Sequence, residues 1–140
     1  MNIDMLNEIK NSVSDFNQIN LINIKKSFLS LLKSLTNRIE QYIGDYPTFI
    51  EPVYLEENVR IGDDVLLGPN VYVGKNCEIG DYVEISNSIL LENVKISENI
   101  KLENCIVIAN CAMNFTNASF NNLLIKGVSD SQNDLQKLSF

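Results

Sequence analysis

A step of six residues between apolar positions constrains the fold of this chain more than any other feature. Twelve apolar residues follow this step, with two intervals shortened to five: Phe49, Leu55, Ile61, Leu67, Val73, Ile79, Ile85, Leu90, Ile96, Leu102, Val107 and Met113. From Leu55 onward, a smaller residue, usually valine, stands two positions before each of them. Residues two apart point to the same side of a strand, so the pattern predicts a series of short strands with one buried side.

Asparagine and aspartate recur in the same register, between consecutive strands. They occupy nine positions of one column, and only Tyr82 departs: Asn58, Asp64, Asn70, Asn76, Asn87, Asn93, Asn99, Asn104 and Asn110. These residue types best tolerate the left-handed backbone of a tight corner. Three such units close one triangular coil of 17 or 18 residues. The sequence therefore predicts a mainly β protein, a parallel β-helix of about four to five coils, roughly 21 Å tall at about 4.8 Å per coil.

The chain before the repeat has helical spacing and is expected to form two helices. The first contains Ile3, Leu6, Ile9 and Val13, and the second is expected from Ile22 to Ile43, about 33 Å long at 1.5 Å per residue. This divides the chain into a helical segment for oligomerisation or packing (1–46), the β-helix (47–127) and a C-terminal tail or cap (128–140).

One outward column of the predicted β-helix is apolar and is the candidate interface. With its neighbours and the facing helical stripe it comprises Tyr54, Tyr72, Ile89, Leu91, Ile106, Ile108, Leu123, Ile125, Phe28, Leu32, Leu35 and Ile39. So apolar a face is expected to be covered, by the chain's own helices, by another subunit, or by both. A second helix longer than the stack would overhang it and contact another copy, which favours a homo-oligomer, a trimer or a dimer.

Composition excludes several function classes. The chain has no histidine, so a histidine general base, a Ser-His-Asp triad and a histidine-bound zinc are impossible within these residues. The three cysteines share the small inward position and are expected to pack in the core. Paired carboxylates such as Glu56-Glu57 fit solvated corners better than a cation or acid-base site. No catalytic, cofactor-binding or metal-ligating residue is therefore assigned, and no cofactor is expected.

Charge and hydropathy bound the partners. A net charge of −7 argues against nucleic acid, because phosphate binding depends on clusters of Lys and Arg. No apolar run approaches the roughly 20 residues of a membrane-spanning helix. The first residues do not resemble a signal peptide, and an odd number of cysteines fits a reducing compartment, so a cytoplasmic location is expected.

The run Ile61 to Gly80 resembles the left-handed β-helix of hexapeptide-repeat transferases. The following Asn87-Ser-Ile-Leu element, within 17-residue coils, is similar to the C-terminal domain of sugar-1-phosphate nucleotidylyltransferases, such as glucose-1-phosphate thymidylyltransferases and mannose-1-phosphate guanylyltransferases. The resemblance implies a left-handed coil. The Gly-rich nucleotide-binding domain of those enzymes has no counterpart in this sequence, and neither has the catalytic histidine of the acyltransferases with this fold.

Together these observations predict a non-catalytic protein for oligomerisation, assembly or regulation, with a nucleotidylyltransferase-like protein as a possible partner. The alternative is a sugar-nucleotide-related transferase, an acyltransferase or a nucleotidylyltransferase subunit, completed by residues of a partner chain.

Overall fold

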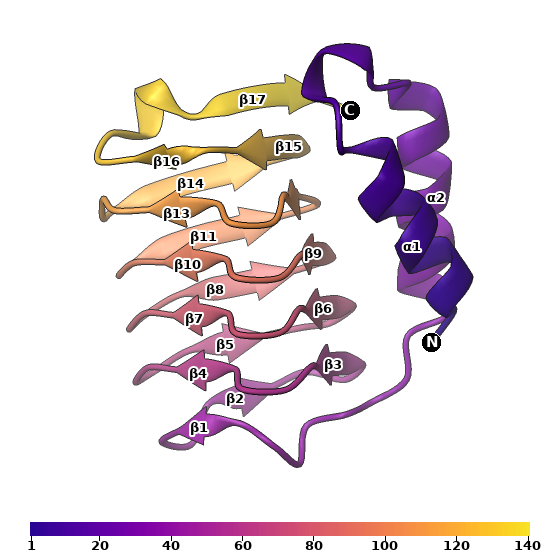
Figure 1. Ribbon diagram of the computed structural model, residues 1–140. Helices are drawn as coiled ribbons and strands as arrows, with labels where there is room; N and C mark the ends of the chain where they lie inside the picture. Colours follow the sequence, from indigo (N-terminus) through magenta and orange to yellow (C-terminus); the bar gives the residue numbers. More distant parts are fainter.

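The computed structural model describes residues 1–140 and forms a left-handed parallel β-solenoid of about five turns, with two helices along one side (Figure 1). Both helices stand beside the solenoid, and the chain then enters its lowest coil and winds upward. Neither helix has the length and hydropathy needed to cross a lipid bilayer.

Three sheets form the sides of the solenoid. They are called here the groove sheet, after the groove described below that runs along it, the helix-covered sheet, which the two helices cover, and the third sheet, which is the remaining side. The groove sheet contains β1 (Ile43–Gly44), β4 (Arg60–Ile61), β7 (Glu78–Ile79), β10 (Lys95–Ile96), β13 (Ala112–Met113) and β16 (Val128–Ser129). The third sheet contains β2 (Thr48–Phe49), β5 (Leu66–Leu67), β8 (Glu84–Ser86), β11 (Ile100–Glu103) and β14 (Ala118–Asn121). The helix-covered sheet contains β3 (Val53–Leu55), β6 (Val71–Val73), β9 (Ser88–Leu90), β12 (Ile106–Val107), β15 (Leu123–Lys126) and β17 (Gln136–Ser139).

The predicted inward positions fill the solenoid. Eleven of the twelve residues of the six-residue step belong to one buried cluster, and Phe49, in the lowest coil, packs against it half-buried. The smaller inward residues join the same cluster, except Ser88, which is also buried. The hydroxyl of Ser88 donates to the carbonyl of Ser86 and accepts from the amide of Cys105, so this polar group is satisfied inside the core. The predicted core is confirmed.

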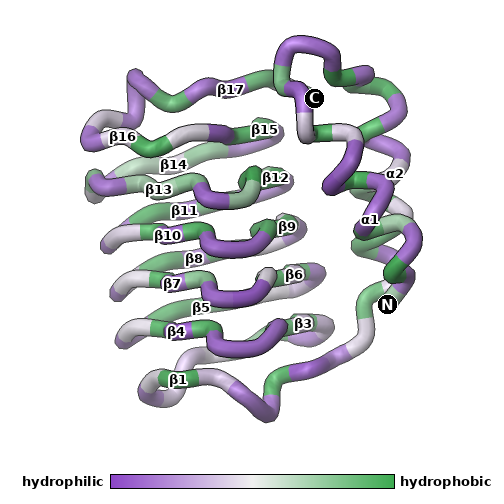
Figure 2. Tube along the Cα trace, in the orientation of Figure 1, coloured by the Kyte–Doolittle hydropathy of each residue, from purple (hydrophilic) through white to green (hydrophobic).

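The corner column has the left-handed backbone that its composition predicts. All nine asparagine and aspartate positions have φ between 47° and 68°, and so has Tyr82 at 58°. Hydrophilic segments mark these corners in Figure 2, and hydrophobic ones follow the strands. Along one corner the amides of successive coils hydrogen-bond in a ladder, from Asn58 to Asn76 (2.9 Å), then Asn93 (3.2 Å) and Asn110 (3.2 Å). These side-chain hydrogen bonds therefore link each coil to the next along this corner.

The helices are shorter than the sequence suggests. Helix α1 covers Ile3–Ser12, a 3-10 turn covers Phe16–Gln18, and α2 covers Leu21–Lys33. The expected helix to Ile43 is wrong by ten residues, because the amide of Arg38 donates to Val53 (3.0 Å) and its carbonyl accepts from Leu55 (2.8 Å). These bonds draw residues 34–42 into the first coil. A 13-residue α2 is about 20 Å long, so the overhang predicted beyond the stack does not exist.

The coil after Met113 contains one more residue than the repeat predicts. The next large core residue is Phe120, seven positions on, and Phe115 packs edge-on against its ring, with the centroids 6.2 Å apart. Ile106 therefore pairs with Leu124, not with Leu123. A shift of one residue exchanges the two faces of a strand, so Ile125 lies in the core and Leu124 points outward.

The upper end of the stack is closed by the chain itself. Strand β17 turns back and pairs antiparallel with β15, from Leu123 opposite Ser139 to Lys126 opposite Gln136. Leu135, just before it, is buried against the core. Phe140 meets Phe28 of α2 edge-on at 5.2 Å, which joins the cap to the helices.

We expect Tyr82→Asn to raise the free energy of unfolding by roughly 0.5–1 kcal/mol, because asparagine adopts the left-handed backbone at lower cost than a bulky side chain. The introduced amide would also lie one coil below Asn99, whose own amide already bonds to Asn117. Urea unfolding measures the change. Tyr82→Val is the control and should destabilise, because a β-branched residue is strained at φ 58°. Equal stability of the two variants would contradict this account of the corner.

Candidate functional site

The predicted apolar column is covered by the chain's own helices. Eight of the candidate residues share one buried cluster: Tyr72, Ile89, Leu91, Ile106, Ile108, Phe28, Leu32 and Leu35. Tyr54 packs against this cluster half-buried. Three candidates lie elsewhere: Ile39 packs below the first coil, Leu123 borders the core and Ile125 is inside it. The structure brings the helices and the column together within one chain.

A polar cluster lies beneath the edge of this helical cover. The Glu56 carboxylate accepts a hydrogen bond from the Tyr72 hydroxyl (3.1 Å) and pairs with the Arg38 guanidinium (3.0 Å). Arg38 also lies over the ring of Tyr54, 5.6 Å from its centroid. Burial first, and then the Glu56 charge, raise the pKa of the Tyr72 hydroxyl far above its ordinary value. This hydroxyl therefore stays protonated and acts as a donor, which suits a structural latch better than proton abstraction.

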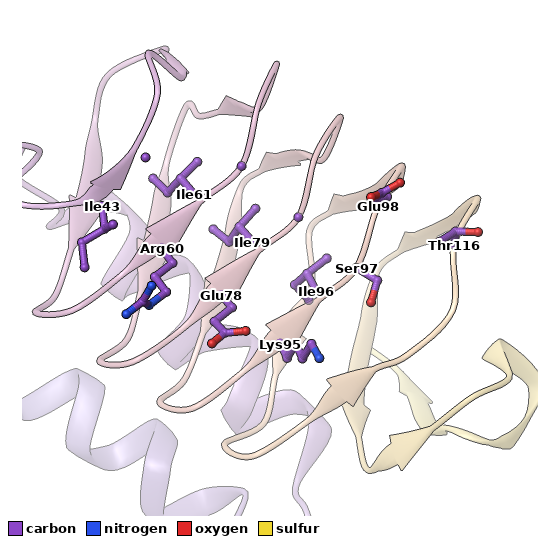
Figure 3. A pocket seen from close by; sticks show the side chains of 13 residues that line it. Ile43, Arg60, Ile61, Glu78, Ile79, Lys95, Ile96, Ser97, Glu98 and Thr116 are labelled. Atoms are coloured by element: carbon purple, nitrogen blue, oxygen red, sulfur yellow. The ribbon is translucent and has the colours of Figure 1, made fainter.

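A groove of about 790 Å³ runs along the groove sheet, beside the corner with the third sheet (Figure 3). Glycines on successive coils form its floor, because a side chain at Gly62 or Gly80 would meet the backbone of the coil above at about 3 Å or less. Its wall carries Arg60, Glu78 and Lys95, one on each successive strand. The groove is therefore an open, charged surface.

The lower end of the solenoid is open. It exposes Ile43, Tyr46 and Ile50, at 50%, 93% and 45% of their surface. Tyr42 and Phe49 lie beside them, half-buried and edge to face with their centroids 5.6 Å apart. These five residues, here called the open-end cluster, have no counterpart of β17 over them.

The three thiols lie inside the solenoid. Burial raises the pKa of Cys77 and of Cys111 to about 12, and it raises that of Cys105 as well. The Cys77 thiol donates to the Leu91 carbonyl, and that of Cys105 to the Glu103 carbonyl. No group of three or more cysteine, aspartate or glutamate side chains is arranged to hold a metal ion.

Sequence reasoning missed two features of these surfaces. Arg38 was placed on a helix, so its pairing with Glu56, 18 residues away, was not foreseen. The open-end cluster was missed because Tyr42 and Ile43 were also placed on that helix. The charged wall of the groove, by contrast, has a signal in the sequence. Arg60, Glu78 and Lys95 are spaced by 18 and 17 residues, the length of one coil, and the strands do stack them in one column of alternating sign.

Comparison with known proteins identifies the fold family. The family described as the GMPPB C-terminal domain matches residues 49–127, more than half of the chain. The chain belongs to this family. No curated protein matches the sequence.

A maltose O-acetyltransferase from Clostridium difficile 630 is a structural neighbour of this family member. It is 16% identical, and the alignment covers 98% of this chain and 82% of that one. The TM-score is 0.28, so the likeness carries no argument about activity.

We expect Glu56→Ala to lower the free energy of unfolding by about 1–3 kcal/mol, because it leaves the Tyr72 hydroxyl and the Arg38 guanidinium without their partner in a half-buried site. Tyr72→Phe removes only one neutral donor and should cost less, about 1 kcal/mol. Thermal unfolding of the two variants ranks them. A reversed order would contradict the latch assigned to Glu56.

The thiols should resist modification in the folded protein. At pH 8, well below the pKa of about 12 of Cys77 and Cys111, an aromatic disulfide reagent should label them only after unfolding. The unfolded thiols ionise near 9.0, so their contribution to stability is full below that pH and is lost as the pH rises toward 12. Rapid labelling of the native protein at pH 8 would contradict this.

Proposed function

We propose that this chain is a non-catalytic assembly module, a β-helix that joins protein subunits through its open end. The open-end cluster carries the proposal, because it gathers aromatic and aliphatic side chains on the one end of the stack that the chain leaves uncovered. Exposed aromatic clusters are typical of protein interfaces.

The position of this cluster supports a particular partner. The matching family is described as a C-terminal domain, so in that protein another part precedes the β-helix. A preceding part reaches a β-helix at its first coil, which here carries the open-end cluster. Together with the resemblance to sugar-1-phosphate nucleotidylyltransferases, this favours a nucleotidylyltransferase-like catalytic domain, supplied by a partner protein, as the occupant.

The reactive side chains of the chain support a non-catalytic role. Its thiols are packed in the core, and its most perturbed tyrosine is bonded to Glu56 beneath the helices. Many of the accessible side chains on the corners and sheet faces are charged or amide groups, and these suit recognition.

The groove favours a second candidate function, a transferase completed by a partner chain. Arg60 and Lys95 could bind an anionic ligand such as acetyl-CoA or a nucleotide sugar, with Ser97 lining the same groove. A saturable thermal shift with acetyl-CoA or GDP-mannose, lost in Arg60→Ala, would favour this candidate. A partner chain would then have to supply the acid-base residue.

We expect the protein to bind the catalytic domain of the organism's own sugar-1-phosphate nucleotidylyltransferase, truncated before its β-helix. Tyr46→Asn should weaken this binding at least tenfold, because it removes the most exposed ring of the open-end cluster. Isothermal titration calorimetry measures both constants.

Tyr82→Asn is the matched control. Tyr82 is also an exposed tyrosine with a left-handed backbone, but it lies on a corner above the open end. Absence of binding by the unmodified protein at tens of micromolar, or equal weakening by both variants, would overturn the proposed docking surface.

A further inference from the structure

The outward side chains of the groove sheet form one straight column of six residues. In order from the first coil to the last they are Ile43, Arg60, Glu78, Lys95, Ala112 and Val128. Both ends of the column are apolar and exposed, Ile43 at 50% and Val128 at 69%. The three charges in its middle form no ion pair within the chain, whose one salt bridge joins Arg38 to Glu56.

This column is complementary to the same column of a second copy that runs in the opposite direction. When a second copy is placed face to face and upside down, Ile43 meets Val128, Arg60 meets the small Ala112, and Glu78 meets Lys95. The same three contacts recur by symmetry in the other half. Both columns have the period of one coil, about 4.8 Å, so all six levels come into register at once. We propose that the groove sheet is a two-fold interface that binds a second, antiparallel copy of this chain.

A second column beside it has the same property. At the corner with the asparagine ladder, the residues on successive coils are Glu57, Lys75 and Glu92, each of whose carbonyls accepts from the amide of the coil above, and then Ala109. The same two-fold axis places Lys75 opposite Glu92 and Glu57 opposite Ala109. The charges of this corner agree with the antiparallel arrangement, as expected of an isologous interface. The corner also borders α1, because Ala109 packs against the helical cluster and Lys75 and Glu92 line a pocket with Lys10, so the groove-sheet column forms the main contact.

The other faces of the solenoid lack this symmetry. The third sheet has an odd number of levels, Thr48, Leu66, Glu84, Lys101 and Ser119, so its reverse places Glu84 opposite itself. The helix-covered sheet is buried by α1 and α2. Only the groove sheet offers a self-complementary face.

The charges of the column decide the relative orientation of the two copies. A parallel pair of copies would place each charge of the column opposite its own kind. The antiparallel pair leaves one unfavourable edge, since Asp81 and Glu98 of the acidic corner would face each other. The groove separates this corner from the column, so the contact is expected to lean toward the asparagine ladder. The interface shares Ile43 with the open-end cluster, but its other five levels lie outside that cluster, so it would hold if nothing docks at the open end.

A cysteine cross-link tests the arrangement. Ile43 and Val128 lie five coils apart, about 24 Å at 4.8 Å per coil, so cysteines at these positions cannot bridge within one chain. In an antiparallel pair they meet across the interface. Oxidised Ile43→Cys/Val128→Cys should therefore run at twice 15.8 kDa on a non-reducing gel. Ile43→Cys alone should stay at single mass, whereas a parallel pair would cross-link it.

Charge reversal tests the pairing without a covalent bond. In the Glu78→Lys variant, a lysine would lie opposite Lys95 of the second copy, and the symmetry repeats this repulsion in the other half of the dimer. The dissociation constant of the dimer should therefore rise about tenfold or more, the equivalent of about 1.4 kcal/mol. Adding Lys95→Glu should restore it. Glu84→Lys on the third sheet is the matched control, because it likewise stacks on a lysine of its own chain, Lys101, yet lies outside the interface.

Analytical ultracentrifugation of these variants gives the dissociation constants, which should rise with ionic strength. A monomer at 100 µM, a dimer that the double cysteine variant does not cross-link, or equal effects of Glu78→Lys and Glu84→Lys would each overturn the interface. A dimer weakened only by Tyr46→Asn would overturn it too, and would assign self-association to the open end.

Discussion

The whole structure depends on the left-handed corner that recurs about every sixth residue. A coil of this solenoid has no core of its own, because its inward side chains are covered only by those of the coils above and below. Stacking in turn requires that every coil bend at the same three places. Asparagine serves both needs, since it tolerates φ near 60° and its amide can bond to the amide one coil above. Local backbone preference and long-range order are thus set by the same side chains.

A stack built in this way has two ends and three faces, and each must be covered by other residues or be suited to solvent or to a partner. Strand β17 reverses direction and closes the upper edge, where a further parallel strand could otherwise add. The apolar face of the helix-covered sheet is buried by α1 and α2, and the Arg38–Glu56–Tyr72 contacts fasten the segment that follows α2 to the coils. What remains accessible is the open end, the charged groove sheet and the third sheet, and the two proposed contacts lie on the first two of these.

The sequence predicted the regular part of the fold almost residue by residue, because periodic apolar positions leave only one register. It failed where a local pattern has two solutions. Leu35, Ile39 and Tyr42 have helical spacing, yet the same side chains suit the helical cover and the base of the first coil, and only the hydrogen bonds of Arg38 decide between these structures. The extra residue between Met113 and Phe120 has no local mark either, since Phe115 fills the added length from within.

The candidate surfaces, like the fold, could be predicted from the sequence only in their regular part. The alternation of Arg60, Glu78 and Lys95 could be read from the spacing of the coils, but its extension to Ile43 and Val128 needed the register of the first and last turns. Adding Ile43 and Val128 to the column changes what the column implies about binding. Three alternating charges alone describe a solvated face, whereas the same charges between two apolar ends, with an even number of levels, describe a face that fits its own reverse. Because the large apolar face is already buried within the chain, such a pairing would rest mainly on screened charges and two small apolar contacts. It would therefore be reversible and sensitive to ionic strength.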